Sequence, residues 1–358
     1  MKIAIGPLVG QYGGVTQHIR NIIQHSKYSH RPITPSPFSV YYSNSWFKRV
    51  AESLLRKYRI DQADPYGLFL SHAFSSKFDI VHLHGHPYWP EIYRKPKNSR
   101  AKYIHTVHQV YLKEDSFSLR EWHFRRWLNS LLFKFCRESD TVISVSKWLQ
   151  KLLYNEYIES IYIPNGVCVK ECESANPVRF RLKYNIEGDF FLFAARIDKY
   201  KRPELFVELA KKMPTKLFVM IGKDVTLESL RAYVKCDIPK NIVCLGELPY
   251  CDVMDAFAAC KVFVLPSKNE VFGITLLEAM ACKKPVVAAD NAGPKEIVIH
   301  GIDGFLFEPD DVNDLHEKSC MAYDHPEIGE RGYMKVKENF DWSIVIKQID
   351  KEYEKLVE

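Results

Sequence analysis

The sequence predicts an α/β protein with two doubly wound domains, and three observations lead to this fold class. The chain has 358 residues, and at roughly 100–200 residues per domain two domains are the first expectation. Short apolar runs alternate with amphipathic stretches, which is the pattern of βα units with a mainly parallel sheet. The alternation forms two sets separated by a turn, so each set predicts a sheet of its own.

The first set predicts an N-terminal domain over residues 1–167. A buried strand is expected at 2–5, because the opening run lacks the small-residue cleavage site of a secretory signal. A turn follows at Pro164-Asn165-Gly166, and the polar, irregular segment 168–181 is expected to be a linker. The other strands of this set are predicted at 80–83, 101–107, 141–145 and 161–163.

The second set predicts a C-terminal domain over residues 168–340. The tail at 342–357 has Ile346, Ile349 and Tyr353 at helical spacing and predicts a final helix. Doubly wound sheets bind ligands beyond the carboxyl ends of their strands, so two facing sheets would place the ligand in a cleft. The strands are predicted at 190–194, 217–221, 242–245, 262–265, 285–288 and 305–307, and helices at 203–213 and 276–281.

Charge is divided unevenly along the chain. Residues 1–170 contain 24 Lys and Arg against 12 Asp and Glu, a net charge of +12, and the remainder has 26 against 32, a net charge of −6. The split predicts that the first half meets an anionic nucleic acid, membrane surface or phosphorylated acceptor, unless the domains are merely oppositely charged. A nucleic-acid reading motif is absent from the sequence, so we expect no nucleic-acid partner.

Composition favours a soluble globular protein. Hydrophobic residues make up 46% and charged residues 26% of the chain, which are ordinary values, and no stretch reaches the roughly 20 apolar residues that span a bilayer. The nine cysteines contain no C-x-x-C pair, which favours free thiols in a reducing cytoplasm.

A glycine-rich loop follows the first predicted strand. Gly10, Gly13 and Gly14 precede a helix expected to start near Val15. Glycines let backbone amides approach a ligand, and a helix N-terminus favours an anion. The loop is not the dinucleotide fingerprint, and a plain tight turn would have the same sequence.

Two cations follow the first strand of the second set. Arg196 and Lys201 lie between that strand and a helix with Pro203 in its first turn. Both can therefore project at the carboxyl end of the strand, where two fixed cations suit a diphosphate. Solvated surface charge is the alternative.

The strongest local signal lies in residues 266–280. Glu270 follows a strand, and Glu278 comes eight residues later, about one turn inside the next helix. Gly273, Ile274 and Thr275 supply amide groups at the start of that helix. The segment predicts an anion site flanked by two carboxylates, which bind sugar hydroxyls well. The alternative is that Glu278 faces solvent on an ordinary helix.

Together these segments resemble glycosyltransferase family four, the large retaining family with the GT-B fold of two Rossmann-like domains facing across a cleft. The two glutamates match its E-x7-E motif, and the similarity covers nearly the whole chain. The C-terminal helix of this fold, here 341–358, crosses back to the first domain. The other matching segments occur in the family's order and are Gly13 and Gly14 with His18, 81–84, 105–108, 144–146, 163–166, Arg196 with Lys201, Gly293-Pro294 with Glu296, and Gly301, Gly304 and Phe305.

The resemblance implies a role for each matching residue. Arg196 and Lys201 would hold the donor diphosphate and stabilise the charge that develops on the leaving group. Glu270 would bind hydroxyls of the transferred sugar, Glu278 the ribose, and His108 would lie beside the reacting sugar. The remaining donor-binding residues would be Gly13, Gly14, Phe272, Gly273, Ile274 and Thr275.

The resemblance also implies the reaction, a retaining hexosyl transfer from a UDP- or GDP-linked sugar. Front-face displacement would depend on positioning and electrostatics instead of the two carboxylates of retaining glycosidases. We expect no metal and no cofactor, because no Asp-x-Asp motif lies in a suitable place and the nucleotide sugar is a substrate. The family often has glycine at the positions of Ala195, Lys283 and Ala292. These departures affect the expected loop geometry, but they remove no charged or hydrogen-bonding group, so the expected reaction class is unchanged.

Two other functions remain open, a sugar-nucleotide epimerase of the same fold and a binding-only relative. The two glutamates favour transfer over epimerisation. A degenerate enzyme would be expected to lose Arg196, Lys201 or Glu270, and all three are present.

A row of histidines ends the second predicted strand. His82, His84 and His86 alternate along it and could point to one side. The family has histidines here without a metal, so no metal site is expected.

Two stretches of the first domain, 46–59 and 120–134, mix cations with aromatic and aliphatic residues at helical spacing. A basic amphipathic helix with Trp and Phe can lie in an anionic membrane interface. We therefore expect a cytoplasmic protein, peripheral on the inner face of the membrane, with a lipid-linked or other glycan acceptor. A core-facing helix with a charged back is the alternative.

Overall fold

The computed structural model describes residues 1–8, 14–33, 78–85, 95 and 99–358. The chain divides into two compact units, and each is described by itself. Unit 1 comprises residues 1–164 and 345–358, and unit 2 comprises residues 165–344.

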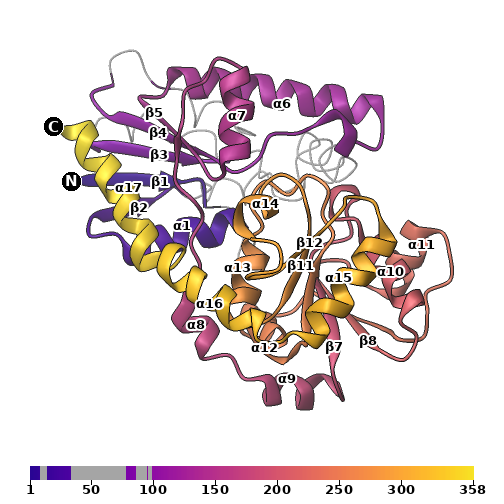
Figure 1. The fold of residues 1–358 in the computed structure, drawn as a ribbon. Helices are drawn as coiled ribbons and strands as arrows, with labels where there is room; N and C mark the ends of the chain where they lie inside the picture. Colours follow the sequence, from indigo (N-terminus) through magenta and orange to yellow (C-terminus); the bar gives the residue numbers. More distant parts are fainter. Residues whose placement is uncertain (9–13, 34–77, 86–94, 96–98) are drawn as a thin grey trace, which may run out of the picture. The chain divides into compact units, whose positions relative to one another are not determined.

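Unit 1 is built on a parallel sheet whose strand order is β2-β1-β3-β4-β5-β6 (Figure 1). The order reverses between β1 and β3, which makes the carboxyl ends of these strands the switch point of the sheet. Every residue of β3 is buried, as expected of a strand covered on both faces. The strands are β1 (Lys2–Gly6), β2 (Ser29–Pro32), β3 (Ile80–His84), β4 (Lys102–Val107), β5 (Thr141–Ser144) and β6 (Ile161–Tyr162).

Helices cover both faces of this sheet. On one face Phe135 of α6 packs with Val81 and Leu83 of β3. On the other face the hydroxyl of Tyr353 in α17 lies 2.6 Å from Nδ1 of His82, so residues 345–358 complete the first unit. The helices are α1 (Gly14–His25), the short η1 (Lys113–Asp115), α6 (Leu119–Glu138), α7 (Lys147–Asn155) and α17 (Trp342–Val357), whose first residues belong to unit 2.

Unit 2 has a second parallel sheet, in the order β12-β11-β10-β7-β8-β9. This is the strand order of the dinucleotide-binding fold, with its switch point between β7 and β10. The predicted parallel α/β class is therefore confirmed in both units. The strands are β7 (Phe190–Ala194), β8 (Leu217–Ile221), β9 (Ile242–Gly246), β10 (Val262–Leu265), β11 (Val286–Ala289) and β12 (Phe305–Phe307).

Aromatic side chains pack helices onto both faces of the second sheet. Phe193 of β7 meets Phe206 of α10 with ring centroids 5.5 Å apart. Phe263 of β10 meets Phe257 of α12 at 5.2 Å. The helices are α8 (Val169–Glu173), α9 (Pro177–Tyr184), the short η2 (Lys199–Lys201), α10 (Pro203–Lys212), α11 (Leu227–Val234), α12 (Tyr250–Ala259), α13 (Ile274–Ala281), α14 (Pro294–Ile297), α15 (Val312–Asp324) and α16 (Ile328–Asn339).

The prediction that residues 168–181 form an irregular linker is wrong. The segment contains α8 and the first residues of α9. The side chain of Asn176 caps α9 by accepting from the amides of Val178 and Arg179 at 3.0 and 3.1 Å. Arg179 also pairs with the buried carboxylate of Asp255. The polar residues that suggested an irregular segment therefore supply a helix cap and an ion pair.

Candidate functional site

The two segments singled out in the second half of the sequence meet at the switch point of unit 2. β7 ends at Ala194, directly before the loop with Arg196 and Lys201, and β10 ends at Leu265, directly before the loop with Glu270. The two strands are neighbours in the sheet. Because parallel strands end at one edge, the cations and the carboxylate share the position where doubly wound sheets bind ligands.

An ion pair between Lys201 and Glu270 joins these two loops. Each side chain is only 14% exposed. Burial acts to lower the pKa of Lys201, but the carboxylate of Glu270 outweighs it and the pKa is raised. The loops are also joined through the backbone, since the amide of Lys268 donates to the carbonyl of Tyr200 at 2.7 Å. Lys201 is thus a fixed cation and not a solvated one.

Arg196 is anchored differently. Its Nε lies 3.2 Å from Oδ2 of Asp198, a carboxylate whose side chain is 2% exposed. The Arg196 side chain as a whole is 37% exposed. The buried carboxylate of Asp198 therefore holds one edge of the guanidinium group, and the side chain remains partly accessible at the carboxyl end of β7.

The start of α13 presents its backbone at the same edge. Gly273 has φ 94°, a left-handed conformation that glycine adopts without strain, and precedes Ile274 and Thr275 in the first turn. Amides of a first turn have no partner within the helix and carry its positive dipole end. Phe272 is buried and its ring lies 6.2 Å from that of Phe340. This aromatic contact anchors the loop that precedes α13.

A close backbone approach fixes the loop that bears Glu270. The amide of Gly293 donates to the carbonyl of Glu270 at 2.9 Å. A Cβ at position 293 would lie 2.4 Å from the carbonyl oxygen of Val271 and 2.6 Å from Cα of Phe272. Only glycine fits here, so the Gly293-Pro294 turn sets the position of the loop.

Glu278 is buried, so the solvent-facing alternative is wrong. The hydroxyl of Tyr250 donates to its Oε1 at 3.2 Å. Burial raises the pKa of Glu278 to about 7, although the Tyr250 hydrogen bond acts to lower it. The carboxyl group therefore exchanges its proton close to neutral pH. The sequence did not point to Tyr250, which lies 28 residues away at the start of another helix.

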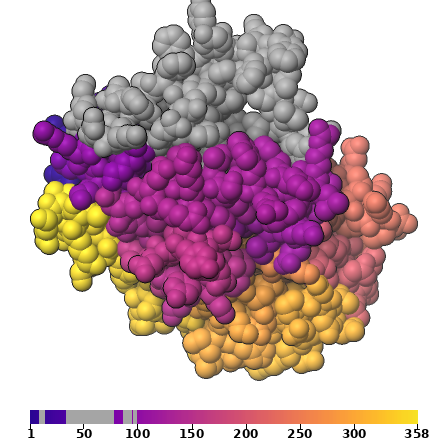
Figure 2. Space-filling view, turned by 90° about the horizontal axis from the view of Figure 1, so that it is seen from above, coloured from indigo at the N-terminus to yellow at the C-terminus, as the bar shows by residue number. Residues whose placement is uncertain are grey.

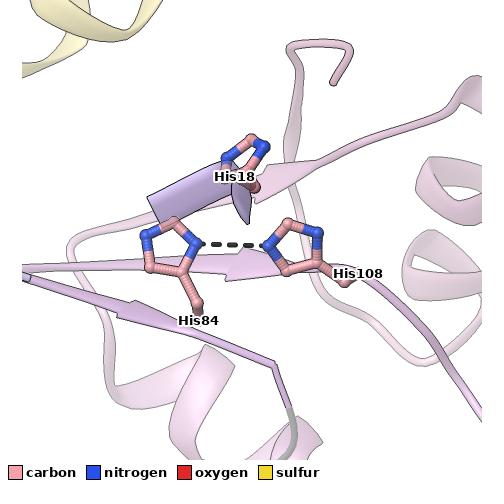
Figure 3. A group of neighbouring side chains, drawn as sticks. All are labelled: His18, His84 and His108. Carbon is pink, nitrogen blue, oxygen red and sulfur yellow. Dashed lines mark hydrogen bonds between the residues drawn. The ribbon is translucent and has the colours of Figure 1, made fainter. Parts of the chain in front are cut away.

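Unit 1 gathers three histidines at its own switch point (Figure 3). His18 comes from α1, His84 ends β3, and His108 follows β4. Nδ1 of His84 lies 3.2 Å from Nε2 of His108, and the ring of His18 lies 4.8 Å from that of His108. Gly14 begins α1, whereas Gly13 lies outside the described residues.

The trio that the structure forms differs from the alternating row His82, His84 and His86. His82 is bound on both sides, by Oγ1 of Thr106 at 2.7 Å and by the hydroxyl of Tyr353 at 2.6 Å. His86 lies outside the described residues. Strand alternation therefore explains the side on which His84 lies, but only the topology brings His18 and His108 to it.

The loop after His108 is held by the buried face of α6. The side chain of Asn129 accepts from the amide of Tyr111 at 3.1 Å and donates to its carbonyl at 2.8 Å. Arg125 lies over the Tyr111 ring and pairs with Glu121 at 2.8 Å. The sequence gave no signal for the contact between Asn129 and Tyr111, because Tyr111 lies 18 residues earlier in a loop.

The opposite face of α6 is exposed and basic, and it belongs to the surface shown in purple and magenta in Figure 2. Arg125 is buried, so it is not part of the cationic face that the sequence suggested. The other basic stretch, 46–59, lies outside the described residues. Among the described helices, none has the length and apolarity to cross a membrane. The exposed residues of the helix are Leu119, Arg120, His123, Arg126, Trp127, Ser130, Lys134, Arg137 and, at its end, Glu138.

Known proteins share both the sequence and the fold. An uncharacterized glycosyltransferase of Methanocaldococcus jannaschii is 27% identical over 377 residues, which cover 99% of each chain. Sucrose-phosphate synthase from Thermosynechococcus elongatus has a similar structure, with a TM-score of 0.73, 18% identity and coverage of 99% of this chain and 98% of that one. HepE from Anabaena, in complex with UDP and glucose, has a TM-score of 0.72, 18% identity and coverage of 99% and 100%.

Two family models divide the chain between them. Residues 12–171 match the model of Glycosyltransferase Family 4, and residues 177–331 match that of Glycosyl transferases group 1. The structural neighbours add the GT-B fold, which agrees with the two parallel six-stranded sheets. The chain belongs to glycosyltransferase family 4, the group 1 glycosyl transferases with the GT-B fold.

Proposed function

We propose that the protein transfers a hexosyl group, with retention of configuration, from a UDP- or GDP-linked sugar to an acceptor hydroxyl. The carrying observation is the arrangement at the switch point of unit 2, where Arg196, Lys201 and Glu270 meet the first turn of α13. Two cations and a helix N-terminus suit a diphosphate. A carboxylate beside them suits sugar hydroxyls. HepE, a structural neighbour, is in complex with UDP and glucose.

The residues divide between the parts of the donor. Lys201 and Arg196 bind the diphosphate and stabilise the negative charge that it gains as it leaves. Glu270 and the amides of Gly273, Ile274 and Thr275 bind sugar and phosphate oxygens, with Phe272 supporting their loop. Glu278 binds the ribose. Gly13 and Gly14 as phosphate contacts, and His108 as a neighbour of the reacting sugar, stay predictions.

The reaction exchanges one bond at the anomeric carbon for another on the same face of the sugar. The bond from the anomeric carbon to the leaving phosphate oxygen breaks, and a bond to the acceptor oxygen forms. The acceptor proton passes to the leaving diphosphate. Fixed cations lower the barrier most if they strengthen their contacts as charge develops. The reaction so written needs neither a metal ion nor a separate cofactor.

We propose further that the acceptor is lipid-linked and that the exposed face of α6 binds an anionic membrane. Arg120, Arg126 and Lys134 on that face alternate with the exposed Leu119 and Trp127. Such a face attracts anionic headgroups and inserts its apolar side chains at the interface. The protein would then work from the cytoplasmic side as a peripheral protein.

The test is a donor screen with and without acceptor. UDP- and GDP-linked hexoses are incubated with the protein and EDTA, and nucleoside diphosphate release and sugar products are measured by chromatography and NMR. Transfer predicts release that rises with a lipid-linked or glycan acceptor and an α-linked product from an α-linked donor. An epimerised sugar formed without acceptor would favour the epimerase. No turnover, with binding intact, would favour the binding-only relative.

A further inference from the structure

The three histidines of unit 1 form a set of metal ligands. One ring nitrogen from each of His18, His84 and His108 can be chosen so that all three lie within 4.8 Å of one another. His18 and His84 are buried and His108 is partly exposed. Figure 3 shows the ring of His18 above the space between the other two. The approach to the cluster is therefore from the side of His108.

The spacing fits a small tetrahedral ion. Zinc binds imidazole nitrogen at about 2.0–2.1 Å, which places neighbouring ligand nitrogens about 3.4 Å apart. Nδ1 of His84 and Nε2 of His108 are 3.2 Å apart. The nitrogen of His18 is within 4.8 Å of both, so ion binding requires the His18 ring to move closer to the other two.

The ligand types select the metal. Imidazole nitrogen suits Zn²⁺, Co²⁺, Ni²⁺ and Cu²⁺, whereas Mg²⁺ and Ca²⁺ prefer oxygen. Three protein ligands leave a fourth tetrahedral position open for water or a hydroxyl group. The cluster is thus suited to a zinc-class ion and not to the ions that usually accompany diphosphates.

The surroundings hold two of the ligands in place. The ring of His82 lies 4.2 Å from that of His84, and His82 is itself fixed by Thr106 and Tyr353. The Asn129 bonds to Tyr111 fix the loop that follows His108. Ligands that are already oriented lose little freedom when they bind an ion.

We propose that His18, His84 and His108 bind one zinc-class divalent ion, and that the bound ion inhibits sugar transfer. All three ligands belong to unit 1, so the ion can bind without donor or acceptor. Only the inhibition rests on the proposed function, because it assumes that His108 serves the reacting sugar. An ion bound to Nε2 of His108 removes that nitrogen from any contact with substrate.

Metal binding is measured first, without donor or acceptor. Metal-free, reduced protein is titrated with Zn²⁺ by calorimetry and with Co²⁺ by absorption spectroscopy. We expect one tight site whose Co²⁺ spectrum has tetrahedral d–d bands and no thiolate charge-transfer band. A thiolate band, or no binding, would overturn the site.

Variants then identify the ligands. His108→Ala and His18→Ala should each weaken Zn²⁺ binding at least tenfold, while His123→Ala, on the exposed face of α6, should bind as the wild type does. Thermal unfolding of each variant verifies that it is folded, and His84→Ala is scored only if it is. Unchanged binding in folded His108→Ala and His18→Ala would overturn the ligand assignment.

Inhibition is tested last, with a donor found by the screen. Zn²⁺ should lower turnover with the same apparent affinity as it binds, and EDTA should restore it. Full activity at saturating Zn²⁺ would overturn the inhibition and leave the metal site intact. If the protein has no transfer activity, the binding titrations still decide whether the site exists.

Discussion

Lys201 and Glu270 lie 69 residues apart in the chain and form a nearly buried ion pair across the carboxyl ends of β7 and β10. A diphosphate and a sugar hydroxyl would each compete for one member of this pair. Removing either partner leaves a buried charge without its counterion, which is strongly destabilising. Both the stability of the loops and the affinity for the donor therefore depend on this contact.

The buried Glu278 predicts a stability that falls as the pH rises. Its pKa is raised from 4.5 to about 7 in the folded protein, so the folded state holds a proton that the unfolded state releases. Its favourable contribution is full below pH 4.5 and is lost by about pH 7, an effect of about 3 kcal/mol. Glu278→Gln removes the titration. Urea unfolding measures the free energy of unfolding of the wild type and of the variant at pH 5 and at pH 8. From pH 5 to pH 8 the wild type should lose about 2–3 kcal/mol relative to Glu278→Gln. The same difference between the two proteins at both pH values would contradict the raised pKa.

Gly293→Ala is predicted to distort the loop of Glu270. The new Cβ would overlap the backbone of Val271 and Phe272, and relieving such overpacking costs about 1–3 kcal/mol. The free energy of unfolding should fall by that amount, and donor affinity should fall with it. Lys295→Ala, an exposed neighbour, should change stability by less than about 1 kcal/mol. Equal stabilities of the two variants would refute the close-approach argument.

Asn129→Ala is predicted to release the loop that follows His108. Two hydrogen bonds to the backbone of Tyr111 are lost, and unsatisfied groups cost about 1–3 kcal/mol. Well below the melting temperature, kcat/KM should fall at least tenfold because His108 loses its position. Ser130→Ala, on the exposed side of the same helix, removes only a bond to Trp127 and serves as the control. If both variants keep wild-type kcat/KM, the loop does not position a functional residue.

Charge reversal on α6 tests membrane binding. Arg120→Glu with Arg126→Glu should weaken binding to anionic vesicles at least tenfold, since each cation near such a surface contributes about 1 kcal/mol. Lys170→Glu with Lys240→Glu makes the same change in net charge on exposed residues of unit 2 and should leave flotation unchanged. Equal flotation of both double variants, or none of the wild type at low salt, would remove α6 as the membrane surface.

The sequence was sufficient for most strands of the two sheets, because strands such as β3 and β7 are buried on both faces. Continuous apolar runs such as Phe190–Ala194 predict strands without any knowledge of their neighbours. β2 was missed because Ser29–Pro32 is largely exposed and has no apolar residue. The tail helix was predicted with its bounds, since Ile346, Ile349 and Tyr353 repeat at helical spacing.

Only part of the candidate site was predicted from the sequence, and there is a physical reason why some of its residues were found and others were not. Arg196, Lys201 and Glu270 follow strands, so a strand pattern places them at one edge. Tyr250 and Asn129 act through side-chain contacts across the fold, and nothing near them in the sequence reveals these contacts. The burial of Glu278 likewise depends on the packing of α12 against α13, which the sequence pattern of either helix does not reveal.

The central claim is that unit 2 binds a nucleoside-diphosphate sugar through Lys201. Calorimetric titration of UDP- and GDP-linked hexoses in EDTA tests it most directly, with Lys201→Ala against Lys268→Ala, a more exposed lysine paired with Asp310 at 3.1 Å. The account predicts that one donor binds the wild type and Lys268→Ala alike and binds folded Lys201→Ala at least a hundredfold more weakly. Equal binding to folded Lys201→Ala, or binding of no donor by the wild type, would contradict it.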